Sequence, residues 1–254
     1  MYTLKNLSSY YAKNKALNNI SLGIYNNALI SLIGSNGSGK TTLLRVLAGL
    51  QNYSGSALLN EREIKNYKRR DFSRLVSIMP SAKNFHPAYN FTAYEIISMS
   101  RLPFKKLFGK LNAHDENIIY SVSEMLDIKN LLHRNILTLS DGERQLILLA
   151  STLAQNTNII ILDEPTSALD PDKAARVFKI LRELAENKII IAAVHDINIS
   201  LAFSNYYIAL KKGCLISHGL TQNLNAVILE KLYNSRFENY FNNKGDVMWR
   251  AVPD

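Results

Sequence analysis

The sequence predicts an α/β fold in which a mainly parallel sheet is preceded by antiparallel strands and interrupted by an inserted helical subdomain. Three observations lead to this prediction. The continuously apolar runs at 28–34, 158–163 and 188–194 have the length and composition of strands buried on both faces of a parallel sheet. Amphipathic segments with helical spacing follow these runs. From 81 to about 154 the chain changes to helices alone, with no Gly/Ser/Pro-rich linker that would mark independent domains.

Each element is expected for a local reason. The segments at 3–11 and 16–25 alternate in polarity and are rich in β-branched and aromatic residues, as strands are. Behind the first buried strand, apolar residues recur at helical spacing up to Gly49, which is placed to cap the helix. In chain order we then expect a strand at 54–60, a basic helix at about 61–74, a strand at 74–80, helices at 92–101, 114–127 and from about 140, a strand at 158–165, a helix at 170–187, a strand at 188–194, a helix at 197–205, a hairpin at 206–219 that turns at Lys212–Gly213, and a short helical tail.

The composition indicates a single globular domain over 1–254. With 47% hydrophobic and 20% charged residues, the chain can bury the core of one α/β domain with a subdomain. The net charge of +9 favours anionic partners such as nucleotides or the acidic inner face of a membrane. No nucleic-acid-binding motif accompanies the charge, so nucleic acid is not an expected partner. The one cysteine, Cys214, excludes an intrachain disulfide, and no apolar run reaches the roughly 20 residues of a membrane-spanning helix.

A glycine-rich loop follows the first buried strand. Glycines permit positive φ and close backbone approach, so successive N–H groups can point at phosphate oxygens. At this spacing we expect Lys40 to reach the β- and γ-phosphates of ATP and the Thr41 hydroxyl to ligate Mg²⁺. A strand before the loop and an amphipathic helix after it are the context that separates such a phosphate-binding loop (P-loop) from an ordinary glycine turn. The predicted nucleotide-binding residues here are Gly34, Ser35, Asn36, Gly37, Ser38, Gly39, Lys40, Thr41 and Thr42.

Two acidic residues close the buried strand that begins at Ile159. Ligands of parallel sheets bind at the carboxyl ends of the strands, where Asp163 emerges. We expect Asp163 to hold Mg²⁺ directly or through water, and Glu164 to polarise an attacking water as a general base. Acidic residues often end strands, so the pair gains its meaning from the P-loop that precedes it.

The stretch LSDGERQ (139–145) predicts a helix start that can hold a second anion, with Ser140 or Asp141 as the cap. The order of this stretch, ILDEP, SALD and an apolar strand ending in His195 resembles the ATP-binding subunit of ABC transporters over nearly the whole chain. The resemblance implies a P-loop NTPase with a RecA-like core at 1–80 and 155–254 and a helical subdomain at 81–154. It also implies ATPase activity.

The resemblance explains why one chain would carry two anion-binding elements. It implies that two subunits, expected to be identical, lie head to tail, so that Ser140, Gly142 and Glu143 of one close over the ATP held by the P-loop of the other. Asp141 and Glu143 replace the glycine and glutamine that are commonest in the family. These replacements add negative charge near phosphate.

Other roles follow from the same resemblance. Tyr11 corresponds to an aromatic residue that stacks on adenine, with Tyr10 as the alternative. His195 corresponds to a histidine that contacts the γ-phosphate, and with Glu164 and Lys40 it completes the expected catalytic set. The segment Ser167–Asp170 corresponds to a loop that communicates between the two ATP sites.

One position departs from the family pattern. Where the family has a proline followed by a glutamine that touches Mg²⁺ and relays to the membrane subunit, this chain has Pro80 and Ser81. The serine hydroxyl can ligate the metal or hold a water molecule, but its reach is shorter. We therefore expect slowed rather than absent hydrolysis.

The segment at 91–116 and the tail at 237–254 resemble importer ATPases for iron–siderophore complexes, haem and cobalamin. This implies a permease partner, whose cytoplasmic helix would enter a groove around Ser81–Arg101, and an external solute-binding protein reached through the permease. The expected location is the cytoplasmic face of the cell membrane. Two alternatives remain: a soluble ABC ATPase of an assembly or nucleic-acid pathway, and an ATP-binding switch that no longer hydrolyses, which Ser81 motivates.

Overall fold

The structure is a computed structural model that describes residues 1–11, 14–79, 90–106, 109–241 and 247–252. Its strands are β1 (Tyr2–Tyr11), β2 (Asn14–Ile24), β3 (Ala28–Ile33), β4 (Ser54–Leu59), β5 (Arg62–Glu63), β6 (Val76–Met79), β7 (Ile159–Asp163), β8 (Ile189–Ala193), β9 (Tyr206–Lys211), β10 (Cys214–Leu220), β11 (Arg236–Phe241) and β12 (Val247–Val252). Its α-helices are α1 (Lys40–Leu47), α2 (Arg69–Phe72), α3 (Ala93–Met99), α4 (Ala113–Met125), α5 (Asp141–Ala154), α6 (Pro171–Leu184), α7 (Ile197–Phe203) and α8 (Ala226–Tyr233).

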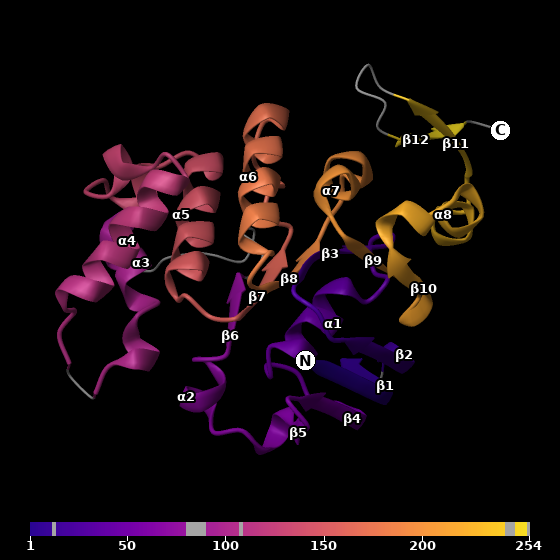
Figure 1. The fold of residues 1–254 in the computed structure, drawn as a ribbon, viewed down its shortest axis with the longest axis horizontal. Helices are drawn as coiled ribbons and strands as arrows, with labels where there is room; N and C mark the ends of the chain where they lie inside the picture. Colours follow the sequence, from indigo (N-terminus) through magenta and orange to yellow (C-terminus); the bar gives the residue numbers. More distant parts are fainter. Residues whose placement is uncertain (12–13, 80–89, 107–108, 242–246, 253–254) are drawn as a thin grey trace.

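The described strands form one large sheet and two smaller ones. The large sheet has the order β10-β9-β3-β8-β7-β6 and is parallel except for the β9–β10 pair. The antiparallel sheet has the order β2-β1-β4-β5 and lies on the opposite side of the molecule from helices α3 to α5 (Figure 1). The predicted α/β class with antiparallel N-terminal strands is therefore confirmed.

The large sheet is buried on both faces, as its continuous apolar strands predict. In β7, Ile160 and Leu162 pack into the core shared with helices α3 to α8. The alternating residues Ile159 and Ile161 point to the other face and pack into the core shared with α1 and the antiparallel sheet. Because neighbouring side chains on a strand point to opposite faces, a run of apolar residues is needed to fill both cores.

The predicted helix at 61–74 is wrong. Asn60 and Glu61 adopt positive φ, which makes a two-residue turn and pairs β5 with β4 as a hairpin. Only Arg69–Phe72 is α-helical in this stretch. Asparagine accepts the left-handed conformation more readily than most residues, and that turn signal outweighed the helical pattern of the basic residues.

The helices between β6 and β7 begin where capping boxes fix their first turns. In each box a side-chain oxygen accepts from a backbone N–H three residues on, while an acidic side chain returns the bond. The cap and acid pairs are Thr92 with Glu95, Asn112 with Asp115, and Ser140 with Glu143. None of the helices in the described ranges is long and apolar enough to span a bilayer.

The C-terminal part contains more than the predicted helical tail. The turn at Lys212–Gly213 joins β9 and β10 as expected. After α8, however, β11 and β12 form a separate two-stranded hairpin beside α7 (Figure 1). Its strands are mostly exposed and do not alternate between buried and exposed residues, so they lack the pattern on which strand prediction depends.

Candidate functional site

The carboxyl ends of β3, β7 and β8 meet at one edge of the large sheet. The backbone N–H of Val194 donates to the carbonyl of Leu32 at 3.2 Å, and that of Glu164 donates to the carbonyl of Ala193 at 3.1 Å. These bonds continue the sheet one step beyond its strands. They bring the glycine-rich loop, the two acidic residues and the segment leading to His195 to the same edge.

The glycine-rich loop is already shaped around a buried cation. The ammonium of Lys40 donates to the carbonyls of Gly34 at 2.6 Å and Ser35 at 3.3 Å, and the side chain is only 7% exposed. Burial lowers the pKa of Lys40, while the nearby carboxylates of Glu164 and Asp163 act in the opposite direction. A cation held this way can bind a phosphate group that enters the loop.

The loop also has unused hydrogen-bonding capacity. The buried hydroxyl of Ser38 has no hydrogen-bond partner among the described residues, and α1 begins at Gly39 without a side-chain cap. Gly34, at φ +149°, must be glycine, because a Cβ there would lie 2.2 Å from the carbonyl oxygen of Leu210. Free helix N–H groups beside a buried ammonium form an anion site.

Asp163 is buried at the end of β7 and forms a hydrogen bond with the side chain of Thr41. Burial raises the pKa of Asp163, the bond with Thr41 lowers it, and the neighbouring Glu164 raises it further. Lys40 and His195 are close enough to act on the same carboxylate. The structure thus brings five of the predicted residues together at one site.

Glu164 and His195 form a close pair at the solvent side of this site. The Nε2 atom of His195 lies 2.6 Å from Oε1 of Glu164, and the imidazole is 45% exposed. The backbone of Glu164 has φ +55°, a left-handed conformation that is uncommon outside glycine. A carboxylate held in a strained turn beside a histidine can orient and polarise a water molecule.

At the start of α5, the predicted anion-binding residues bind one another. The carboxylate of Glu143 accepts from the N–H of Ser140 at 2.8 Å and from its hydroxyl at 2.9 Å. Arg134 lies 3.6 Å from the other carboxylate oxygen, and Asp141 pairs with Arg144. Ser140, rather than Asp141, is therefore the cap, and its hydroxyl is engaged within its own helix.

Gln145, which the sequence did not single out, joins α5 to the site at the strand ends. Its amide is fully buried, donates to the carbonyl of Glu164 at 2.6 Å and accepts from the N–H of Ala168 at 2.7 Å. A signal was available, because Gln145 stands four residues before Leu149 on the apolar side of the predicted helix. A polar residue in that position must find partners in the core.

Tyr233 of α8 was also missed. Its hydroxyl contacts the backbone of Gly34 in the glycine-rich loop. Burial raises the pKa of Tyr233 to about 12, and the contact with Gly34 acts in the opposite direction. No local pattern in the sequence could connect a C-terminal tyrosine to this loop, since the contact depends on tertiary packing.

The remaining predicted residues lie apart or are not described. Tyr10 and Tyr11 are exposed at the end of β1, so both of the alternatives for stacking on a base are accessible. Arg101 is buried, pairs with Asp115 at 3.1 Å and therefore does not line an open groove. Ser81 lies outside the described residues.

Known proteins match this chain along most of its length. The sequence profile of the ABC transporter family matches residues 17–167, well over half of the chain. An uncharacterised ABC transporter ATP-binding protein of Methanocaldococcus jannaschii is 32% identical over 244 residues, which cover 94% of this chain and 83% of the relative. The ferric enterobactin transport ATP-binding protein of Escherichia coli K12 is 30% identical over 230 residues, which cover 89% and 84%.

Two solved structures share the fold. An inward-facing ABC transporter described as of the metal-chelate type has a TM-score of 0.83 at 25% identity, covering 99% of this chain and 97% of that one. A dimeric ATP-binding cassette bound to ADP and phosphate has a TM-score of 0.77 at 25% identity, covering 88% and 100%. This chain therefore belongs to the family of ABC transporter ATP-binding proteins, ATPases that hydrolyse ATP to power transport.

Proposed function

We propose that this chain is the ATP-hydrolysing subunit of an importer that carries a metal chelate. The observation that carries the hydrolytic part is the meeting of Lys40, Asp163, Glu164 and His195 at one sheet edge. The cargo class is supported by relatives, among them the iron(3+)-hydroxamate import ATP-binding protein of Bacillus subtilis, 32% identical over 212 residues that cover 82% of this chain and 78% of that protein. The metal-chelate type of the structural relative supports the same class.

The residues at the site fit Mg²⁺ as well as ATP. The Thr41 hydroxyl and the Asp163 carboxylate are hard oxygen donors already in contact. Within the described ranges, no cluster of three or more His, Cys, Asp or Glu side chains could hold a metal ion by itself. That fits an ion that takes one or two protein ligands and completes its shell with phosphate oxygens and water. When bound, Mg²⁺ would neutralise charge on the phosphates.

Each residue then has a defined task in hydrolysis. Lys40 and the N–H groups at the start of α1 hold the phosphates, and the unpartnered hydroxyl of Ser38 offers one further donor. Glu164 accepts a proton from the attacking water, and His195, paired with it, contacts the γ-phosphate. In line with the dimeric relative, Ser140, Gly142 and Glu143 of a second copy complete the site.

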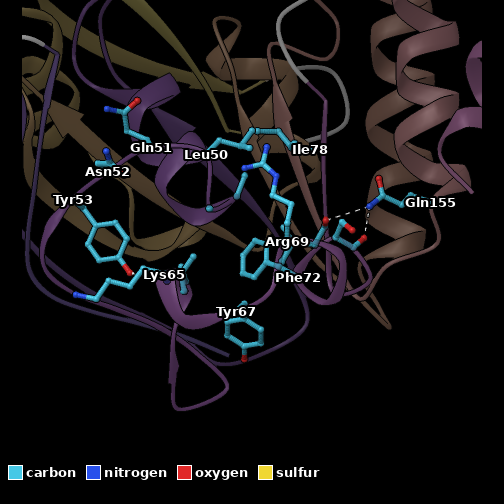
Figure 2. Close-up of a pocket in the computed structure, with 15 residues that line it drawn as sticks. Leu50, Gln51, Asn52, Tyr53, Lys65, Tyr67, Arg69, Phe72, Ile78 and Gln155 are labelled. Atoms are coloured by element: carbon cyan, nitrogen blue, oxygen red, sulfur yellow. Dashed lines mark hydrogen bonds between the residues drawn. The ribbon is translucent and has the colours of Figure 1, made fainter. Parts of the chain in front are cut away.

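A groove at the end of α1 away from the P-loop offers a place for the permease. A cavity of about 670 Å³ lies between the end of α1, the segment leading into α2, and Gln155 after α5, and Figure 2 shows residues that line it. Leu50, Tyr53 and Phe72 are among its lining residues. The amide of Gln155 donates to the carbonyls of Ser73 and Val76 across its floor. We assign this groove, instead of one containing Arg101, to a short cytoplasmic segment of the permease.

Replacing Glu164 with Gln tests the hydrolytic assignment. We expect turnover to fall about 10²- to 10⁴-fold, the contribution of a general base, while ATP binding persists and an ATP-bound dimer accumulates. Glu183→Gln, on the exposed side of α6, is the matched control and should leave turnover unchanged. Normal hydrolysis by Glu164→Gln would show that the base has been misassigned.

Cargo and partners need a separate experiment. The tagged chain, purified from native membranes in mild detergent, should carry a permease, and uptake of radiolabelled iron–siderophore should require both. Haem and cobalamin serve as alternative substrates in the same assay. Recovery from the cytosol with no membrane protein would instead favour a soluble ABC ATPase of another pathway.

A further inference from the structure

The C-terminal hairpin of β11 and β12 lies beyond the part of the chain that the family profile matches, which ends at 167. It stands beside α7 in Figure 1, and β12 contacts that helix. The side chain of Trp249 on β12 packs against the same hydrophobic core as Ile197 and Phe203 of α7. The hairpin is thus attached to the helix that follows His195.

A single amide makes the polar part of this attachment. The Nδ2 atom of Asn198 donates to the carbonyl of Trp249 at 2.8 Å, and the N–H of Trp249 donates to Oδ1 of Asn198 at 2.7 Å. Both bonds have good length, and both use the backbone of one residue. The asparagine therefore acts as an extra strand partner for β12 and fixes its own position in the first turn of α7.

The first turn of α7 depends on such contacts. The helix has seven residues, fewer than the roughly 12 that give an isolated helix marginal stability in water. Asp196 caps it by accepting from the N–H of Ile199 at 3.0 Å, and Phe203 stacks on Phe178 at its far end. Between these points, the Asn198–Trp249 bonds hold the turn that starts two residues after His195.

We propose that Asn198 is a positioning residue for His195, and that the C-terminal hairpin acts through it on ATP hydrolysis. The inference rests on the role proposed above for His195. Asn198 is not proposed to contact the nucleotide or the attacking water. It limits the movement of the first turn of α7, and so keeps the imidazole within reach of Glu164.

A double-mutant cycle in the full-length chain tests this inference. His195→Ala alone should reduce kcat by about 10²-fold or more. Asn198→Ala alone should reduce kcat by up to about 10²-fold, the loss that a displacement of 1 Å can cause, with little change in the KM for ATP. If Asn198 acts through His195, Asn198→Ala should cause no further loss in the His195→Ala background.

Two further variants separate positioning from general destabilisation. Asn112→Ala removes the cap of α4, which accepts from the N–H of Asp115 at 3.0 Å, and destabilises the chain away from Asn198, Trp249 and the phosphate-binding loop. It should lower the melting temperature but leave kcat intact. Asn198→Asp keeps the acceptor for the Trp249 N–H and should retain an intermediate kcat.

Each outcome of the cycle is informative. Losses that add in the double mutant would show that Asn198 does not act through His195, which overturns the inference and leaves the proposed function standing. An equal fall in kcat for Asn112→Ala would also overturn it, since general destabilisation would then suffice. A His195→Ala variant with normal kcat would remove the proposed role of His195 itself.

Discussion

The helices α1 and α5 both begin with a turn suited to anions, but they reach that state in opposite ways. α1 starts at Gly39 with no side-chain cap and no acidic residue in its first turn. α5 starts at Ser140 with a complete capping box and two acidic residues in its first turn. The first N–H groups of α1 have no side-chain cap, whereas at α5 the N–H of Ser140 donates to the Glu143 carboxylate and the N–H of Glu143 donates to the Ser140 hydroxyl.

In the proposed dimer, this difference separates the two halves of each ATP site. The P-loop is already formed in a single subunit, with Lys40 and Ser38 buried in it. At α5, the carboxylate of Glu143 is held by the N–H of Ser140 at 2.8 Å, at the start of the helix. In the proposed dimer, we expect this negative charge beside the second subunit's ATP to oppose closure.

The largest expected effect comes from the far end of α5, where Arg101 donates to the carbonyls of Ala154 at 2.9 Å and Gln155 at 3.0 Å. Its guanidinium pairs with Asp115, which also pairs with Lys105. Replacing Asp115 with Asn should lower the free energy of unfolding by about 3–5 kcal/mol, because a buried charge loses its partner. Denaturant titration of both proteins at pH 7 measures it.

The pH dependence of this pair has a defined sign. Burial raises the pKa of Asp115, but hydrogen bonds from the Asn112 N–H, Lys105 and Arg101 outweigh it and bring the pKa down to about 2. The carboxylate therefore stabilises the fold above its unfolded pKa of about 3.9, and this contribution disappears as the pH falls toward 2. The difference between Asp115→Asn and the parent should shrink over that interval. Glu124→Gln, which breaks only the exposed pair with Lys129, should cost under about 1 kcal/mol.

Lys40→Met tests the P-loop side of this comparison. Removing a buried charge that binds phosphate should weaken ATP binding by at least about 30-fold, equivalent to about 2 kcal/mol or more. Calorimetric titration with ATP and Mg²⁺ gives the affinity. Arg45→Met, on the exposed side of the same helix, should bind ATP as the parent does. Unchanged affinity in Lys40→Met would show that the loop does not hold the nucleotide.

The smallest expected effect comes from Glu143 at the start of α5. Glu143→Gln restores the residue commonest in the family and removes one negative charge, so ATP-dependent dimers should become more stable by about 1 kcal/mol or less. Sedimentation of the Glu164→Gln background with ATP measures the dimer constant. Glu95→Gln is a matched control, because Glu95 makes the same bonds to Thr92, at 2.7 and 2.9 Å, in the capping box of α3. Equal dimer stability for both variants would mean that Glu143 does not oppose closure.

The sequence predicted those parts of the site whose chemistry is carried by adjacent residues. The P-loop spacing from Gly34 to Thr41 and the strand ending in Asp163 needed only their own neighbours, and the structure brings them together. The capping role of Ser140 was one of two alternatives, and the reciprocal bond from Glu143 decides it.

What the sequence did not predict depends on contacts between distant segments. Arg101 is buried against the end of α5, where it donates to the carbonyl of Ala154, 53 residues away. Asn198 bonds the backbone of Trp249, 51 residues away. The β4–β5 hairpin was not predicted, because basic residues at helical spacing favoured a helix over the turn at Asn60–Glu61.

The buried amide of Gln145 has a consequence for how hydrolysis at the two ATP sites of a dimer is coupled. In the proposed dimer, one end of α5 lies over the neighbour's nucleotide, while Gln145, one turn further along, donates a hydrogen bond to the carbonyl of Glu164 in its own subunit. In that arrangement, a shift at one catalytic centre would be transmitted along α5 to the opposite nucleotide. We then expect ATP occupancy of one site to change the rate of hydrolysis at the other.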